Sequence, residues 1–197
     1  MSNTKRFVTM RVLTMAALLL VTSVSGWLHA QTIGQPERFN AIAIVNNTQG
    51  SGAGTVQIQV SRWSTANERR QLLDVLRSKG AEKLLDTLRD MRPVGTIKTP
   101  DSLAYDLRYA HETAGEDGGR RIVIATDRPI GFWEARRNGR TLDYPFTVIQ
   151  MEIGRDGKGK GTLSYATKII AKDDSIILEN FGTSPVMLTE IQSEKAN

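Results

Sequence analysis

Cysteine is absent from this 197-residue sequence. Disulfide bonds, thiol catalysis, cysteine-ligated metals and a lipid-modified cysteine anchor are therefore excluded. Histidine is scarce as well, because the chain contains His29 and His111 alone, whereas a histidine-based metal site draws on several ligands at set spacing. We expect no metal and no other cofactor, and we expect the fold to be stabilised by its core.

A strong excess of one charge is also lacking once the first thirty residues are set aside. The chain has 26 Lys+Arg and 21 Asp+Glu, a formal net charge of +5. Residues 1–30 contain three of the basic residues and no acidic one, which leaves 23 basic and 21 acidic residues in 31–197. Because nucleic acids and anionic membranes are bound by concentrated basic faces, we expect no nucleic-acid partner.

Those first thirty residues have the layout of a secretory signal peptide. Lys5, Arg6 and Arg11 give a positive start, an apolar run covers 12–24, and a cleavage position follows Ala30. The pattern predicts a periplasmic or secreted protein, with no stable membrane insertion after cleavage of about 1–30.

An uncleaved membrane anchor is the alternative reading of this segment. A spanning helix needs about 20 mostly apolar residues, and the run here is shorter and interrupted by Thr14, Thr22 and Ser23. Leu28 stands where a small residue usually precedes the cut, so the cleavage position could shift by a few residues.

The remaining residues, 31–197, have the length of one domain. Short runs rich in β-branched residues, several with apolar and polar residues alternating, predict strands. Asp156-Gly157 is a strong signal for a hairpin turn, and the polar residues 193–197 suggest a frayed end. The predicted strands cover 38–45, 55–63, 94–98, 103–111, 121–126, 144–153, 161–171, 175–180 and 186–191.

One helical hairpin is predicted at about 66–92. Thr65 and Glu68 have the spacing of a capping box, in which each side chain bonds the other residue's backbone N–H. Gly80 suits the end of a first helix and Pro93 ends a second, and each helix carries a stripe of leucines typical of core packing. The fold class is therefore α+β, a mainly antiparallel sheet with one helical hairpin, and the sequence leaves open whether the sheet is barrel-like or a sandwich.

Three stretches resemble a family of uncharacterised exported bacterial proteins, met especially in acidobacteria. They are DSLAYDLRYA (101–110), RIVIATDRPIGFWEA (121–135) and DYPFT (143–147), and the resemblance extends from 62–64 to 179–186. The resemblance implies an exported bacterial protein. It implies no activity, cofactor or catalytic residue.

A glycine-rich segment and Trp63 are each explained by structural roles. Gly50, Gly52 and Gly54 are followed by a strand, whereas a phosphate-binding glycine loop needs a helix after it. The segment 46–54 is therefore expected to be a hairpin loop. Trp63, between a strand and the helical hairpin, is expected to be a packing anchor.

The densest cluster of charged and aromatic residues runs from Asp127 to Arg140. Arginine and tryptophan side chains on a loop can grip a carboxylate, a phosphate or a sugar. The alternative is a surface salt-bridge cluster with the tryptophan packed on the sheet. The candidate binding residues are Asp127, Arg128, Trp133, Glu134, Arg136 and Arg137.

These observations favour a non-catalytic envelope domain that binds a protein or a small ligand. The alternative is a small extracytoplasmic hydrolase that uses Asp127 and Glu134 as an acid/base pair or His111 as a base. His111 ends a predicted strand, where a surface histidine is the ordinary reading. A structural subunit assembled through an exposed sheet edge is a third possibility.

Overall fold

The computed structural model describes residues 34–47, 50–130, 144–172, 175–180 and 184–195. These residues belong to one unit of the chain, Gln31–Asn197. The predicted signal peptide lies outside the described residues. Within the described part, no helix combines the length and the apolar character needed to cross a membrane.

The α+β fold class predicted from the sequence is confirmed. The described residues form one antiparallel sheet, one helix and a short 3₁₀ turn, η1 (Glu116–Gly118). The elements are β1 (Glu37–Asn47), β2 (Gly50–Val60), α1 (Ala66–Asp90), β3 (Gly95–Lys98), β4 (Tyr105–Leu107), β5 (Tyr109–Ala114), β6 (Arg120–Thr126), β7 (Phe146–Ile153), β8 (Lys158–Lys172), β9 (Ser175–Asn180) and β10 (Val186–Lys195).

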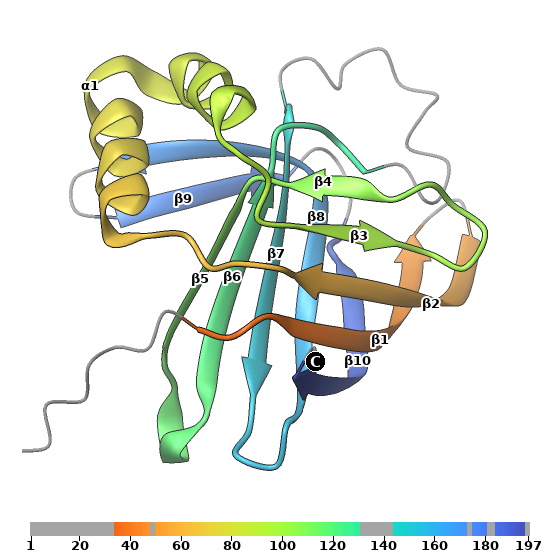
Figure 1. Cartoon of the computed structure of the whole chain (residues 1–197). Helices are drawn as coiled ribbons and strands as arrows, with labels where there is room; N and C mark the ends of the chain where they lie inside the picture. Colours follow the sequence, from red (N-terminus) through yellow and green to blue (C-terminus); the bar gives the residue numbers. More distant parts are fainter. Residues whose placement is uncertain (1–33, 48–49, 131–143, 173–174, 181–183, 196–197) are drawn as a thin grey trace, which may run out of the picture. The chain divides into compact units, whose positions relative to one another are not determined.

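The sheet curls into a nearly closed barrel (Figure 1). Its strand order is β4-β3-β2-β1-β10-β8-β7-β6-β5. The two ends of this order, β4 and β5, are separated in the chain by Arg108 alone. Val94 N donates to Leu107 O at 2.8 Å on one side, and Arg108 N donates to Ala125 O at 3.0 Å on the other. The single stretch 105–114 therefore joins both ends of the sheet.

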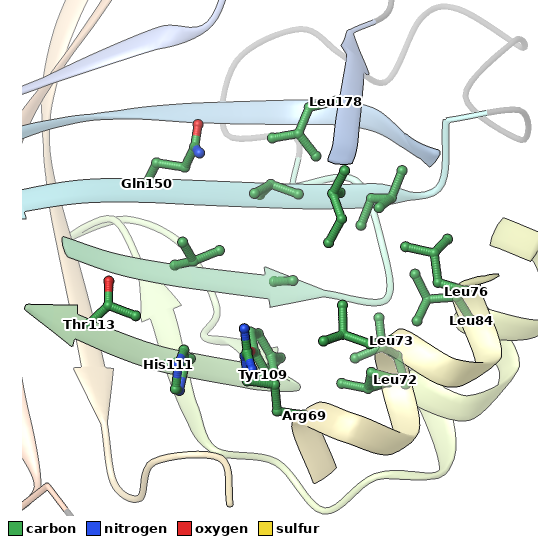
Figure 2. Close-up of a pocket in the computed structure, with 16 residues that line it drawn as sticks. Arg69, Leu72, Leu73, Leu76, Leu84, Tyr109, His111, Thr113, Gln150 and Leu178 are labelled. Atoms are coloured by element: carbon green, nitrogen blue, oxygen red, sulfur yellow. The ribbon is translucent and has the colours of Figure 1, made fainter. Parts of the chain in front are cut away.

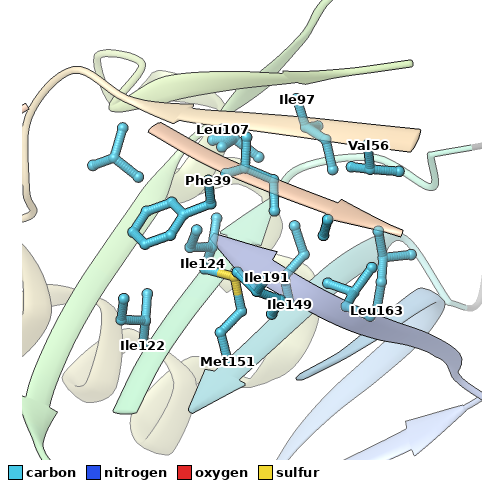
Figure 3. Packing of buried hydrophobic residues seen from close by; sticks show 14 of the residues in the cluster. Phe39, Val56, Ile97, Leu107, Ile122, Ile124, Ile149, Met151, Leu163 and Ile191 are labelled. Carbon is cyan, nitrogen blue, oxygen red and sulfur yellow. The ribbon is translucent and has the colours of Figure 1, made fainter. Parts of the chain in front are cut away.

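Apolar side chains fill the interior of this barrel (Figure 3). If β4 and β5 are counted as one interrupted strand, the described barrel has eight strands. Inward-facing side chains can fill the interior of a barrel of this size. The predicted alternation in β2 is confirmed, because Val56, Ile58 and Val60 are fully buried. Trp63 is the expected packing anchor: it is buried in the same cluster, and its Nε1 donates to Gln35 O at 3.1 Å.

Helix α1 packs against the outer face of the sheet and builds a second apolar cluster. Its two segments meet at Gly80, whose φ of +80° is the left-handed conformation that glycine adopts most easily. Each segment contributes leucines to the cluster, as the two predicted stripes require. Its fully packed members are Leu72, Leu76, Leu84, Leu88, Phe146, Val148 and Ile169.

Strand β8 is long because its two parts pair with different strands. Its first part pairs with β7 and β10, and its last part, Thr167–Lys172, pairs with β9. The β8–β9 hairpin lies beside α1 (Figure 1). Ile169 and Leu178 of this hairpin face the helix and belong to the second cluster or pack against it.

Two boundary predictions are wrong. The predicted loop 46–54 is mostly strand, because β1 runs to Asn47 and β2 starts at Gly50. The predicted frayed end begins too early, since β10 continues to Lys195 and Ser193 N donates to Gly157 O at 2.8 Å. In both places pairing with a neighbouring strand satisfies the backbone of residues with weak strand preference.

The predicted strand 103–111 is also interrupted. Unbroken alternation would place four apolar side chains on one face: Leu103, Tyr105, Leu107 and Tyr109. Arg108 breaks the strand, so that Leu107 and Ala110 both face the barrel interior while Tyr109 faces outward. Leu103 precedes β4 and is 88% exposed.

The N-terminus of α1 is fixed by Glu68, which has two roles. Thr65 N donates to Glu68 Oε2 at 2.7 Å and Glu68 N donates to Thr65 Oγ1 at 3.2 Å, which confirms the predicted capping box. Arg62 also donates to both Glu68 carboxylate oxygens at 3.0 Å, and to Arg92 O at 2.7 Å. Burial favours a higher pKa for Glu68, but these hydrogen bonds and the Arg62 charge outweigh it and lower the pKa below its ordinary value.

Replacing Glu68 by alanine is expected to lower the free energy of unfolding by about 1–2 kcal/mol, because the cap and the ion pair are both lost. Glu68→Gln, which keeps the cap, should lose less at pH 7. As the pH falls through the lowered pKa, the wild type loses the contribution of the carboxylate and should converge on the glutamine variant. Urea unfolding at pH 7 and pH 3 measures both effects, and a constant gap between the two proteins would contradict the assignment.

Candidate functional site

A groove lies between α1 and the outer face of the sheet (Figure 2). Its volume of about 330 Å³ falls within the range of small-ligand sites. Leucines of α1 form one wall, and side chains of β5–β9 form the other. The lining residues are Arg69, Leu72, Leu73, Leu76, Leu84, Leu88, Tyr109, His111, Thr113, Val123, Ala125, Val148, Gln150, Ile169, Ile176 and Leu178.

The strand register sets a gradient of polarity along the groove floor. One cross-strand row consists of Tyr109, Ala125 and Val148. The next row outward from it consists of His111, Val123 and Gln150. A third row consists of Thr113, Arg121 and Glu152, where Arg121 Nη2 lies 3.7 Å from Glu152 Oε1. The floor therefore changes from apolar near the helix leucines to polar at His111, Gln150 and Thr113. The Arg121–Glu152 pair lies outside the groove lining.

Arg69 lies at the polar part of the groove, beside Tyr109 and His111 (Figure 2). Burial raises the pKa of Tyr109, although the Arg69 charge and its hydrogen bond to the phenol oppose this. Burial and the Arg69 charge lower the pKa of His111, while Glu112 opposes them. Tyr109 and His111 are therefore mainly uncharged at neutral pH, and Arg69 supplies the positive charge of the groove lining.

Of the candidate binding residues in the predicted cluster 127–140, the structure describes Asp127 and Arg128. Asp127 is buried, with 6% of its surface exposed, and its Oδ1 lies 3.5 Å from Arg108 Nε. Arg128 is exposed, and its Nε lies 3.9 Å from the same oxygen. Trp133, Glu134, Arg136 and Arg137 lie outside the described residues, so their role in binding stays a prediction.

Asp127 contacts the residue at which the two ends of the sheet meet. Arg108, which it contacts, is the residue between β4 and β5, and Arg108 Nη1 also donates to Met91 O at 3.0 Å. Thr126 Oγ1, next to Asp127, donates to Asp106 O at 2.7 Å. This bonding assigns Asp127 a structural role at the seam of the sheet.

His111 lies within β5 and is half-buried in the groove. The sequence pattern favours a surface histidine, with a general base as the alternative, and gives no connection between His111 and Arg69. The signal that could have found the groove is the alternation of Tyr109, His111 and Thr113 on one face of a strand, together with a leucine-striped helix. That signal does not say which face the helix covers.

The described residues contain no group of three acidic or histidine side chains placed to hold a metal ion. No protein-family model, curated protein or solved structure matches the chain. The geometry of the described residues is therefore the basis for any assignment of function.

Proposed function

We propose that this protein is a non-catalytic binding module whose groove, between α1 and the outer face of the barrel, takes a small apolar ligand. The observation that carries the proposal is the groove itself. Most of its lining consists of leucine, isoleucine, valine and alanine side chains, with polar groups gathered in one part. Small-ligand sites commonly combine an apolar cavity with a few polar groups that fix orientation.

The outer groove is a better ligand site than the barrel interior. The interior is occupied by a continuous cluster of buried side chains, from Phe39 on β1 to Ile191 on β10. A ligand there would have to displace packed core residues, at a cost similar to that of overpacking a core. The groove needs no such displacement.

The composition of the groove favours binding over catalysis. Among the described residues that line it, His111 could act as a general base, but no aspartate or glutamate lines the groove beside it. Tyr109, its ring neighbour at a centroid distance of 6.2 Å, has a raised pKa and is a poor nucleophile at neutral pH.

The predicted export to the cell envelope is kept as part of this proposal, and rests on the signal-peptide pattern alone.

Ile176 and Ile177 offer a matched test. They are neighbours on β9 with similar exposed fractions, 48% and 41%, but only Ile176 lines the groove. Ile176→Asp is expected to weaken binding of the neutral fluorescent probe N-phenyl-1-naphthylamine by roughly tenfold or more, because it places a charge against an apolar ligand. Ile177→Asp should leave the affinity within about twofold of the wild type.

Fluorescence titration of the purified protein measures both affinities, and thermal unfolding of each variant checks that it is folded. Equal loss of binding in both variants would place the probe elsewhere on β9. No binding to the wild type would contradict the proposed function.

A further inference from the structure

Resting on the proposed function, we infer that the ligand is a single-chain amphiphile with an anionic head group, held with the head group beside Arg69 and the chain along the leucines of α1. This assignment adds the chemistry of the head group and the direction of binding to the proposal of an apolar site.

The first observation is the charge of the groove. Arg69 is the one charged residue among the described residues that line it. Neighbouring arginines have partners of their own: Arg62 pairs with Glu68, and Arg70 donates to Asn67. Arg69 instead lies beside the phenol of Tyr109 in the groove lining, where its charge lowers the Tyr109 pKa against the effect of burial. A guanidinium bordering an apolar groove, with no carboxylate in the lining, is suited to bind an anion.

The second observation is that the polar groups are confined to one part of the groove. Figure 2 shows His111 and Thr113 along β5 on the side of Arg69 away from Leu76 and Leu84. Gln150 is in the same cross-strand row as His111. These side chains supply hydroxyl, amide and imidazole groups that can bond the oxygens of a head group. Leu76 and Leu84, by contrast, pack in the apolar cluster with Phe146 and Ile169.

The third observation is the size of the groove. Its volume of about 330 Å³ is at the lower end of the range for ligand sites. This volume suits one alkyl chain better than the two chains of a membrane phospholipid. Since one end is polar and cationic and the rest is apolar, the ligand that satisfies both parts is an anion with one chain.

The test compares four ligands of one chain length: dodecanoate, dodecyl phosphate, dodecanol and dodecyltrimethylammonium. Each competes with N-phenyl-1-naphthylamine for the purified protein at pH 8, below its micelle concentration. Both anions are expected to bind roughly tenfold more tightly than the alcohol, because a charge-assisted hydrogen bond to Arg69 replaces a neutral one. The cation should bind more weakly than the alcohol.

Arg69→Met and Arg70→Met separate the head group from the chain. Arg69→Met should remove the preference for the anions over dodecanol, so that the affinities of the two anions fall to that of the alcohol. Arg70→Met is adjacent in sequence and does not line the groove, so it should keep the preference for anions. Because methionine retains a long apolar side chain, both variants are expected to fold.

The outcomes distinguish the two levels of the proposal. If none of the four ligands displaces the probe and the probe itself does not bind, the proposed function is wrong. If the alcohol and the anions bind equally, or if Arg69→Met keeps the anion preference, the site stands and the head-group inference is overturned. If one anion binds more tightly than the other and depends on Arg69, the inference is supported and the head group is assigned to a carboxylate or a phosphate.

Discussion

Replacing Leu107 by alanine is expected to lower the free energy of unfolding by about 2–5 kcal/mol, the usual range for a leucine removed from a packed core. Leu107 is fully buried in the barrel interior. It also lies at the seam of the sheet, where its carbonyl oxygen accepts a hydrogen bond from Val94 N. The next residue, Arg108, donates its backbone N–H to Ala125 O on the other side of the seam. The cavity would therefore lie next to the point where the two ends of the sheet meet.

Leu103 is the matched control for this experiment. It is the same residue type, four positions earlier in a run that the sequence predicts to be one strand, and it is 88% exposed. Leu103→Ala should change the free energy of unfolding by less than about 0.5 kcal/mol. Urea denaturation of both variants gives the comparison, and similar losses would mean that the two leucines share a face as unbroken alternation requires.

Replacing Arg120 by methionine is expected to cost about 3 kcal/mol, because it leaves a buried carboxylate without its cation. Arg120 Nη2 donates to Glu37 Oε1 at 2.6 Å, and Nη1 donates to Glu37 Oε2 at 2.9 Å and to Glu112 Oε2 at 3.0 Å. These hydrogen bonds, chiefly those to Glu37, raise the pKa of Arg120 despite its partial burial. The cluster links β1 to the paired strands β5 and β6, neither of which neighbours β1 in the sheet.

Two further variants test whether the loss in Arg120→Met comes from the unpaired Glu37 carboxylate. The double variant Glu37→Met with Arg120→Met removes the buried charge together with its partner, and should recover part of the loss. Arg121 is adjacent to Arg120 in sequence and forms an exposed ion pair with Glu152. Arg121→Met should therefore lower the free energy of unfolding by less than about 1 kcal/mol. If the double variant were less stable than Arg120→Met alone, the desolvation argument for Glu37 would be wrong.

The elements that the sequence predicted well depend on short-range chemistry. The alternation of Val56, Ile58 and Val60, the Thr65–Glu68 capping box and the break at Gly80 each involve residues a few positions apart. The Asp156-Gly157 turn is of the same kind, since Asp156 Oδ1 accepts from Lys158 N at 3.1 Å and Gly157 has a positive φ.

The errors occurred where a distant strand decides the backbone conformation. Arg108 interrupts the predicted strand 103–111 because its N–H bonds Ala125 and its side chain bonds Met91 and pairs with Asp127. The ion pair between Arg108 and Asp127 likewise joins residues that are 19 positions apart, and it forms only where the ends of the sheet meet. The groove was missed for the same reason, since Arg69 and His111 are on different elements and meet only when α1 packs on the sheet.

The sequence by itself determined the class of this protein: a cysteine-free α+β chain with a signal-peptide pattern, period-two strands and a leucine-striped helical pair. Local periodicity and capping carry that information because they act within a few residues. The tertiary structure decided that the sheet curls until β4 and β5 meet, and that α1 covers the outer face instead of entering the core. Both outcomes depend on which apolar faces can be buried together, and packing of the leucine faces against Val148 and Ile169 leaves the groove that the proposed ligand would occupy.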